Sequence, residues 1–495
     1  MSDNQNHRFV YNVAKLASGN AFAQALAILI TPLLTRLFEP SDFGVAALFI
    51  SISAIITIIS CMRYELSIML PEDEGEAANL FFISLFSVLF ITSLASAIIF
   101  FSHDGIVKLF QSQELGRYLW LLPLSILSNG IILAFNYWNA RIKAFGRTSR
   151  AVVLSSATAQ AAKISGGFLG YTTGGVLIGA TVLGQALSAF YMSVSILGKD
   201  FKEFSQNITL AKIRQGVVRH KKFPLIDLWG ALLNTVSWQL PALMLGAFFS
   251  PVIVGLYALG NSVIRAPINL IVGSIAQVFY QRTSEARNRG NIASVVERVF
   301  KRLVSFGLFP MFLLCFMGKD LFIVAFGKEW AEAGMYTQIL APWMFFTFIS
   351  SPLSVLFSVY ERQGTAMLLQ SSIFLTRFAS LYVGGIMGNV YVALLLYSIS
   401  GIAVYGLFGV WNLALAQVRP SVFWSTIFKY GMFSLPAGVL MYLMKYTMGA
   451  SPLAMTVASV LLISGYELYV VCNDKELAAQ INLLRFARKD TTRVE

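Results

Sequence analysis

The sequence predicts an all-α polytopic membrane protein with about 14 transmembrane helices. Three observations favour this fold class: 57% of the 495 residues are hydrophobic, only 12% are charged, and the mean hydropathy is +0.69. Soluble domains are less apolar and carry about twice this share of charged residues. Apolar runs of about 20 residues recur along the chain, and this is the length that a helix needs to cross the hydrocarbon core of a bilayer.

The predicted spans alternate with short polar loops. In order they cover 15–36, 41–62, 79–102, 118–138, 151–171, 174–197, 225–249, 252–274, 301–324, 335–359, 366–387, 390–414, 421–444 and 451–472. Of the 37 lysines and arginines, 27 fall in segments on the side of the N-terminus and 6 in loops on the opposite side. Because cytoplasmic loops carry the excess of Lys and Arg, both termini are predicted to be cytoplasmic.

A repeated hairpin divides the spans into two halves. Phe38–Leu48 matches Phe249–Leu259 as F-x-P-x-x-x-G-x-x-A-L, at a constant offset of 211 residues. Six spans, an even number, separate the copies, so they share one orientation and predict two parallel six-helix lobes plus two additional helices. The predicted domains are an N-terminal lobe at 1–197, a basic cytoplasmic linker at 198–224, a C-terminal lobe at 225–414, additional helices at 415–472 and a cytoplasmic tail at 473–495.

Four cations inside the spans are the main candidates for a binding site. Lys163, Arg265 and Arg377 lie near mid-span, and Lys429 lies about eight residues from a cytoplasmic end. Each of the three mid-span cations costs about 2.5–3.5 kcal/mol on insertion scales, so a functional contact is the first hypothesis. Two explanations stay open for each cation. It meets a polyanionic head group in a water-filled cavity between the lobes, or it bonds helix carbonyls and polar side chains nearby. For Lys429 the second explanation is that its long side chain extends to the cytoplasmic interface.

Amide side chains in the first and seventh spans extend this set of candidates. Asn20 and Gln24 are four residues apart and share a helix face, and Asn234 and Gln239 occupy similar positions in the second half. These four residues suit the lining of a cavity. Ordinary hydrogen bonding between helices explains them equally well.

Two carboxylates inside the spans are candidates for ion coupling. Asp227 and Glu467 lie close to cytoplasmic ends, and the other two acids in the spans, Asp42 and Asp320, lie at outer ends. A proton carried by Asp227 or Glu467 could alternate with an anionic substrate and shift the balance between inward- and outward-facing states. Pairing with a nearby cytoplasmic Lys or Arg is the simpler explanation.

The motifs favour a transporter over an enzyme. The sequence has no phosphate-binding loop, its three histidines are isolated in loops, and its three cysteines are scattered without metal-ligand spacing. The net charge of +13 lies in short loops between apolar spans, so it indicates membrane topology rather than nucleic-acid binding. We therefore expect no catalytic residues, no cofactor, no metal and no nucleic-acid partner.

Three stretches resemble the polysaccharide-repeat-unit flippases of the multidrug/oligosaccharidyl-lipid/polysaccharide exporter (MOP) superfamily. The sequence LTRLFEPSDFG at 34–44 is similar to their first hairpin, and 223–281 resembles their seventh and eighth helices. FGKEWAEAG at 326–334, with LAP at 340–342 and SPL at 351–353, looks like their ninth-to-tenth helix region. The resemblance covers nearly the whole chain.

The resemblance implies a multi-pass inner-membrane flippase. It would move a polyprenyl-pyrophosphate-linked oligosaccharide, the repeat unit of an O-antigen, capsule or exopolysaccharide, from the inner to the outer leaflet by alternating access. The implied partners are this lipid-linked oligosaccharide and membrane lipids, with a polysaccharide polymerase and a chain-length regulator as further candidates.

Three alternatives remain: a lipid II flippase, a multidrug or small-solute antiporter of the same superfamily, and a membrane glycosyltransferase or polymerase. Lipid II flippases carry arginines within the first helix, where this chain has Lys15, Asn20 and Gln24. Drug exporters usually have twelve spans and bind cations at intramembrane carboxylates, which the span centres here lack. All the predicted outer loops are short, which argues against the enzymes.

Overall fold

The computed structural model describes residues 2–197, 208–266, 268, 279, 283 and 291–473, with no side chains described for 2–17, 196–197, 363 and 366. Three predicted segments therefore lie partly outside the described residues. They are the linker 198–224, the span 252–274 and the tail 473–495.

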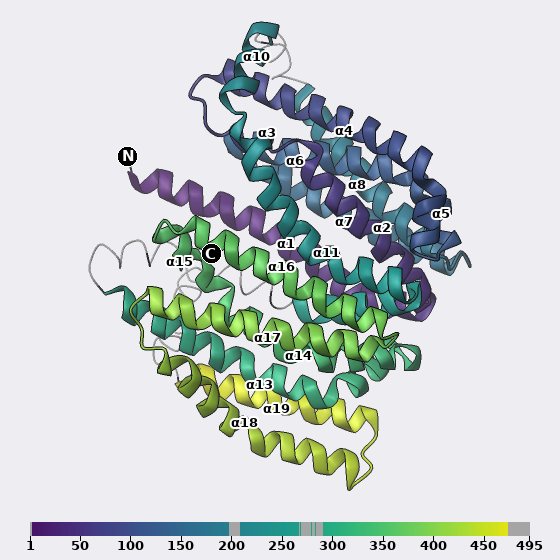
Figure 1. The fold of residues 1–495 in the computed structure, drawn as a ribbon, viewed down its shortest axis with the longest axis vertical. Helices are drawn as coiled ribbons and strands as arrows, with labels where there is room; N and C mark the ends of the chain where they lie inside the picture. Colours follow the sequence, from purple (N-terminus) through teal and green to yellow (C-terminus); the bar gives the residue numbers. More distant parts are fainter. Residues whose placement is uncertain are drawn as a thin grey trace, which may run out of the picture. The chain divides into compact units, whose positions relative to one another are not determined.

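The described residues form helices and turns, with no strand among them (Figure 1). The α-helices in order are α1 (Ser2–Leu37), α2 (Pro40–Ser60), α3 (Tyr64–Ser67), α4 (Glu74–Leu109), α5 (Gln113–Tyr118), α6 (Leu122–Arg141), α7 (Phe145–Phe168), α8 (Gly174–Leu197), α10 (Leu210–Arg219), α11 (Leu228–Phe248), α13 (Ile292–Phe326), α14 (Ala331–Ser350), α15 (Val355–Val359), α16 (Gln363–Ile386), α17 (Val390–Leu415), α18 (Ser421–Tyr446) and α19 (Pro452–Asn473). The 3-10 helices are η1 (Leu119–Leu121), η3 (Lys328–Trp330) and η4 (Pro352–Ser354), and η2 (Phe223–Asp227) is a π-helix. A further helix, Pro251–Ala266, follows α11.

The helices have the lengths of membrane spans. In the described part of the chain, 11 helical segments are long and apolar enough to cross a membrane, and the helix Pro251–Ala266 is apolar but shorter. Together with α7 and α16, each of 24 residues, they follow the order of the predicted spans. The predicted fold class, an all-α membrane protein with about 14 helices, is confirmed.

Three helices extend well beyond the spans predicted for them. α1 begins at Ser2, α4 begins at Glu74 and ends at Leu109, and α13 begins at Ile292. Hydropathy marks only the apolar part of a helix, and the polar turns beyond that part keep their backbone hydrogen bonds. At about 1.5 Å per residue, 35 residues extend roughly 52 Å, which exceeds a hydrocarbon core of about 30 Å. The ends of these helices therefore reach past the apolar layer.

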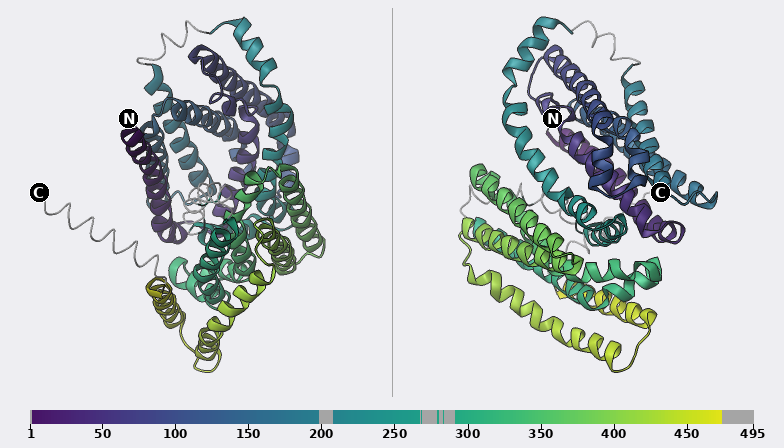
Figure 2. Two further views of the ribbon diagram at one scale, coloured as in Figure 1. Left: turned by 90° about the vertical axis from the view of Figure 1, so that its left-hand side faces the viewer. Right: turned by 45° about the vertical axis from the view of Figure 1, so that its right-hand side comes forward.

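The chain folds into two compact units. Unit 1 comprises Met1–Ala266 and Met367–Tyr397, and unit 2 comprises Pro267–Ala366 and Ser398–Glu495. In unit 1, α7 packs on α1 and α8, α6 on α4 and α8, and α2 on α11 (Figure 2). In unit 2, α13 packs on α14, α18 and α19. The predicted lobes are sequence repeats, whereas the units are defined by contacts, so the lobe boundaries stay a prediction.

One apolar core of unit 1 lies next to the end of α2. It joins buried Cys61 and Tyr64 to Phe81 of α4 and to Phe135 and Trp138 of α6. The rings of Phe81 and Phe135 meet edge to face, with centroids 5.0 Å apart. This core fixes the position of the short helix α3 against α4 and α6.

The described part of the predicted linker contains a helix, α10. Its first turn is capped by Thr209, whose hydroxyl accepts a hydrogen bond from the Lys212 amide. Arg219 at its last turn pairs with Glu76 of α4 at 2.6 Å. α10 therefore packs along α4 as part of unit 1.

Candidate functional site

α11 carries an acceptor that its own helix does not satisfy. Pro241 lies inside α11 and has no N–H, so the Ser237 carbonyl, four residues earlier, lacks its usual helical donor. Nη1 of Arg377, from α16, donates to this carbonyl and to the Ser237 hydroxyl, each at 3.0 Å. Pro241 thus leaves the Ser237 carbonyl without a donor in mid-helix, and Arg377 supplies that donor.

Two guanidinium groups lie against one indole ring. The Cζ atom of Arg265 is 4.2 Å from the centroid of Trp238, and that of Arg377 is 4.5 Å away. A cation over a tryptophan face is attracted by the ring quadrupole, by about 2 kcal/mol or more when the pair is desolvated. Trp238 therefore offsets part of the cost of keeping two cations within membrane-spanning helices. We call Trp238, Arg265 and Arg377 the arginine–tryptophan cluster.

The two arginines differ in exposure. The Arg377 side chain is almost fully buried, with 2% of its surface exposed. Arg265, in the helix Pro251–Ala266, is partly exposed, and it forms no ion pair within the described ranges. Arg265 therefore presents the accessible charge of the cluster, and Arg377 is held inside the protein.

Three of the four predicted amides hydrogen-bond between helices of unit 1. Gln24 of α1 donates to the Ala266 carbonyl at 3.1 Å, one residue from Arg265. Gln239 accepts from Ser51 of α2 at 3.1 Å, and Asn234 accepts from Gln370 of α16 at 3.0 Å. Asn20 is exposed on α1. Interhelical bonding thus accounts for these three amides, and it also places Gln24 beside the cluster.

The other two predicted cations do not contact Trp238. Lys163 is partly buried on α7, and its ammonium group makes no ion pair or hydrogen bond in the described structure. Lys429 belongs to unit 2, where it lines a cavity of about 540 Å³ together with Arg298, Arg302 and Tyr466.

The two predicted coupling acids also lie in different units. Asp227, at the end of η2 in unit 1, accepts from Nε of Arg63 at 2.8 Å. This is the pairing with a loop cation that the simpler explanation predicted. Glu467 is partly buried on α19 in unit 2, with no ion pair among the residues described. No group of three or more potential metal ligands occurs in the described part of the chain.

The sequence reasoning missed Ser237, Trp238 and Pro241. A signal was present, because Trp238 lies in mid-span, away from the interfaces where tryptophan usually anchors a helix. It also stands between two polar residues, Ser237 and Gln239, three positions before a proline. A mid-span tryptophan in such a context is a reasonable partner for an intramembrane arginine.

Comparison with known proteins identifies the family. Residues 33–335 match the model of a family described as polysaccharide biosynthesis protein, which is more than half of the chain. The chain belongs to this family. Trp238 and Arg265 lie within the matched region, and Arg377 lies beyond it. None of the curated proteins compared with the chain matches it in sequence.

Solved structures of several flippases and transporters have the same fold. The lipid II flippase MurJ, in an inward closed conformation, superposes with a TM-score of 0.72 at 13% identity, over 92% of this chain and 99% of that one. An inward-facing MATE family multidrug transporter has a TM-score of 0.62 at 14% identity, over 80% and 95%. A MOP superfamily transporter from Pyrococcus furiosus, described as having a binding pocket of reverse polarity, has 0.54 at 15%, over 82% and 96%. The resemblance expected from the sequence is confirmed by the family match and, for the fold, by these flippase and transporter structures.

Proposed function

We propose that this polysaccharide biosynthesis protein is a flippase for a polyprenyl-pyrophosphate-linked oligosaccharide. It moves the lipid-linked repeat unit from the inner to the outer leaflet of the inner membrane by alternating access, with both termini in the cytoplasm. The observation that carries the proposal is the arginine–tryptophan cluster, in which Arg265 stays partly exposed within a membrane-spanning region.

The cluster suits a diphosphate better than a neutral or cationic ligand. Arg265 presents a planar fork of donors that matches two phosphate oxygens. Arg377 is turned away toward Ser237, but its charge lies on the same indole ring and makes the local potential more positive. We therefore assign Arg265 to direct contact with the diphosphate, and Arg377 to positioning Trp238. Lys163, Asn20 and Gln24 are further candidates for contact with the substrate.

The charge of the cluster also separates this function from the alternatives. An antiporter for cationic drugs needs a carboxylate to bind its substrate, whereas the cluster joins two guanidinium groups. A lipid II flippase would share the diphosphate chemistry and differ in the sugars that it accepts. A polymerase and a chain-length regulator are the partners that would consume and measure the product.

A binding measurement on the purified protein in nanodiscs tests this assignment. We expect polyprenyl-diphosphate oligosaccharide to bind more tightly than the corresponding monophosphate. Arg265→Gln should weaken binding by about 10- to 100-fold, because a hydrogen bond to a charged group contributes about 1.5–3 kcal/mol. Arg265→Lys should recover part of the affinity, since it restores the charge without the fork.

Arg36 provides the matched control, because it is an exposed arginine at the end of α1. Arg36→Gln should bind like the wild type. Equal affinities of the wild type and Arg265→Gln for the diphosphate would rule out the assignment of Arg265. Tight binding of a cationic drug, with no binding of the diphosphate, would favour the antiporter.

A further inference from the structure

A buried carboxylate lies where α2 turns into α3. α2 ends at Ser60, and Met62 and Arg63 then adopt left-handed backbone conformations, with φ of 50° and 63°. The chain reverses its direction here, and Glu65, in the first turn of α3, is buried as a result. Glu65 has no exposed surface, which is rare for a carboxylate unless it is fully paired.

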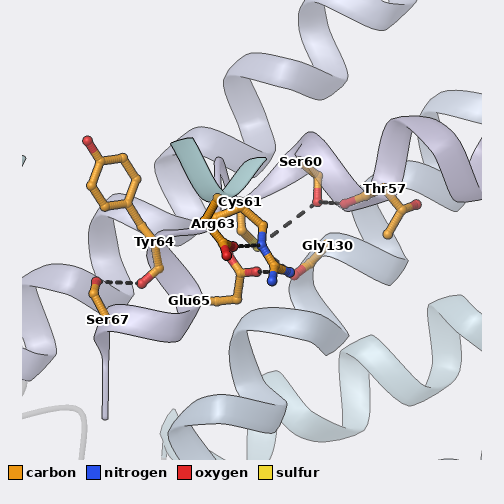
Figure 3. Close-up of polar contacts among 9 residues, drawn as sticks. Thr57, Ser60, Cys61, Arg63, Tyr64, Glu65, Ser67 and Gly130 are labelled. Carbon is orange, nitrogen blue, oxygen red and sulfur yellow. Dashed lines mark hydrogen bonds and ion pairs between the residues drawn. The ribbon is translucent and has the colours of Figure 1, made fainter. Parts of the chain in front are cut away.

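Arg63 is shared between two carboxylates. Its Nη1 donates to Oε1 of Glu65 at 3.3 Å, and its Nε donates to Oδ2 of Asp227 at 2.8 Å. Figure 3 shows the side chains of Arg63 and Glu65 facing each other within the turn that follows Ser60 and Cys61. The Arg63 side chain is 16% exposed, whereas that of Asp227 is 48% exposed. Arg63 thus links the end of α2 to η2, the π-helix from which α11 continues.

Arg63, Glu65 and Asp227 form a second cluster, which has one positive charge too few to be neutral. Two carboxylates and one guanidinium sum to a single negative charge, and the other titratable groups that face Glu65 are Cys61 on its own turn and Tyr137 on α6. Neither supplies a cation. Oε2 of Glu65 is buried and has no hydrogen-bond partner in the described structure. An unpaired oxygen of this kind is costly when it carries charge, and protonation removes the cost.

Geometry selects Glu65 rather than Asp227 as the residue that takes the proton. Asp227 is half exposed to solvent and has the shorter bond to Arg63. Glu65 is completely buried and has the longer bond, so its charged form is the less well stabilised of the two. Protonation of Glu65 leaves a neutral cluster in which Arg63 pairs with Asp227 alone.

We propose that Glu65 is a proton-binding site whose occupancy sets how strongly Arg63 holds Asp227 at the start of α11. One proton adds to the Glu65 carboxylate and the charge of the cluster changes from −1 to zero. Arg63 then pairs with one carboxylate instead of two, so its ion pair with Asp227 at the end of η2 becomes stronger. As α11 also carries Ser237 and Trp238, this link connects proton binding to the arginine–tryptophan cluster. Its role in transport rests on the proposed function, whereas the proton-binding site itself does not.

The electrostatics of the site place its titration near neutral pH. The pKa of Glu65 is raised to about 7, chiefly by burial; the negative charge of Asp227 also raises it, while the Glu65 backbone amide and Arg63 lower it. Glu65 lies between the membrane-spanning segments Pro40–Ser60 and Glu74–Leu109. On the predicted topology this is the cytoplasmic side, where pH is near neutral.

Infrared difference spectroscopy of the purified protein tests the proposal without any substrate. A protonated carboxyl group has its own carbonyl stretching band, which we expect to titrate near neutrality in the wild type over about pH 5–9. The part of the band that Glu65 contributes should be lost in Glu65→Gln, so the band should be weaker than in the wild type. It should persist in Glu72→Gln, the matched control, because Glu72 is an exposed acid of the same loop.

Two variants that keep Glu65 test the sharing of Arg63. Asp227→Asn should move the midpoint of the band to lower pH, because it removes a negative charge and leaves Arg63 to Glu65. Arg63→Gln should move it to higher pH. A band as intense in Glu65→Gln as in the wild type, or a midpoint that neither variant moves, would overturn the proposal. Either result would leave the binding of diphosphate at Arg265 unaffected, so the two failures are distinguishable.

Discussion

Gly44 and Gly255 pack against each other reciprocally. They hold the same position in the two copies of the repeated hairpin, and both belong to unit 1. A Cβ atom on Gly44 would collide with the Pro251 carbonyl, and one on Gly255 would collide with the Pro40 carbonyl. The repeat is therefore a contact as well as a sequence pattern. The glycine of each copy lets the first turn of the other copy's helix approach closely.

We expect Gly44→Ala and Gly255→Ala each to destabilise the protein by about 1–3 kcal/mol, the usual effect of overpacking. Backbone atoms are the obstacle at both positions, so no side chain can turn away to relieve the collision. Thermal midpoints of the purified variants measure the effect. Gly230→Ala in α11 is the control, because no described residue outside its own turn of helix lies within 4 Å of the added carbon. Midpoints equal to that of the control would contradict the reciprocal packing.

The bond between Arg377 and Ser237 predicts an unusual rescue. Arg377→Met should destabilise the protein by about 1–3 kcal/mol or more, because it leaves the Ser237 carbonyl buried without a donor. Pro241→Ala restores an N–H that can donate to this carbonyl within α11. The double variant should therefore be more stable than the sum of the single effects predicts.

A double-mutant cycle measures this coupling, which we expect to be on the order of 1 kcal/mol. Strictly additive effects would show that the proline and the arginine do not share the carbonyl. Pro436→Ala is a suitable control for proline replacement, because Pro436 lies inside α18 in unit 2. It should not couple to Arg377.

The burial of Glu65 predicts a pH-dependent loss of stability. The folded protein holds the pKa of Glu65 at about 7, above the value of roughly 4.3 expected in an unfolded chain. The folded state therefore binds the proton more tightly, and stability falls as pH rises from about 4.5 to 7. The full effect is on the order of 3 kcal/mol.

Glu65→Gln should abolish this pH-dependent loss of stability. The thermal midpoint of the variant, relative to that of the wild type, should therefore increase as pH rises from 5 to 8. Glu72→Gln should follow the wild type. Parallel midpoints for the wild type and Glu65→Gln across this range would show that Glu65 ionises as freely in the folded protein as in the unfolded one.

Much of the fold could be predicted because apolar length, charge asymmetry and the hairpin repeat are local patterns. The helices follow the predicted order, and Arg265 and Arg377 stood out because charge in a span is costly. The mid-span position of Trp238 marks it as a candidate partner, but the sequence does not show that both arginines meet it. Trp238 meets them only through packing between segments far apart in the chain, and no spacing rule connects such segments.

Glu65 was missed for a related reason. A carboxylate beside Arg63 in a short loop is normally exposed to water, and nothing in the sequence indicates that Met62 and Arg63 turn left-handed. Glycine or asparagine at those positions would have given that signal. Only the packing of α3 against α4 and α6 shows that the carboxylate is buried.

Lipid translocation by the reconstituted protein tests the central claim most directly. Liposomes with polyprenyl-diphosphate oligosaccharide in both leaflets would be probed with an impermeant sugar-modifying reagent. We predict that the wild type and Arg36→Gln make the inner-leaflet pool accessible, that Arg265→Gln is at least about 10-fold slower, and that Arg265→Lys is intermediate. Equal translocation rates for the wild type and Arg265→Gln, at equal amounts of folded protein, would contradict the account.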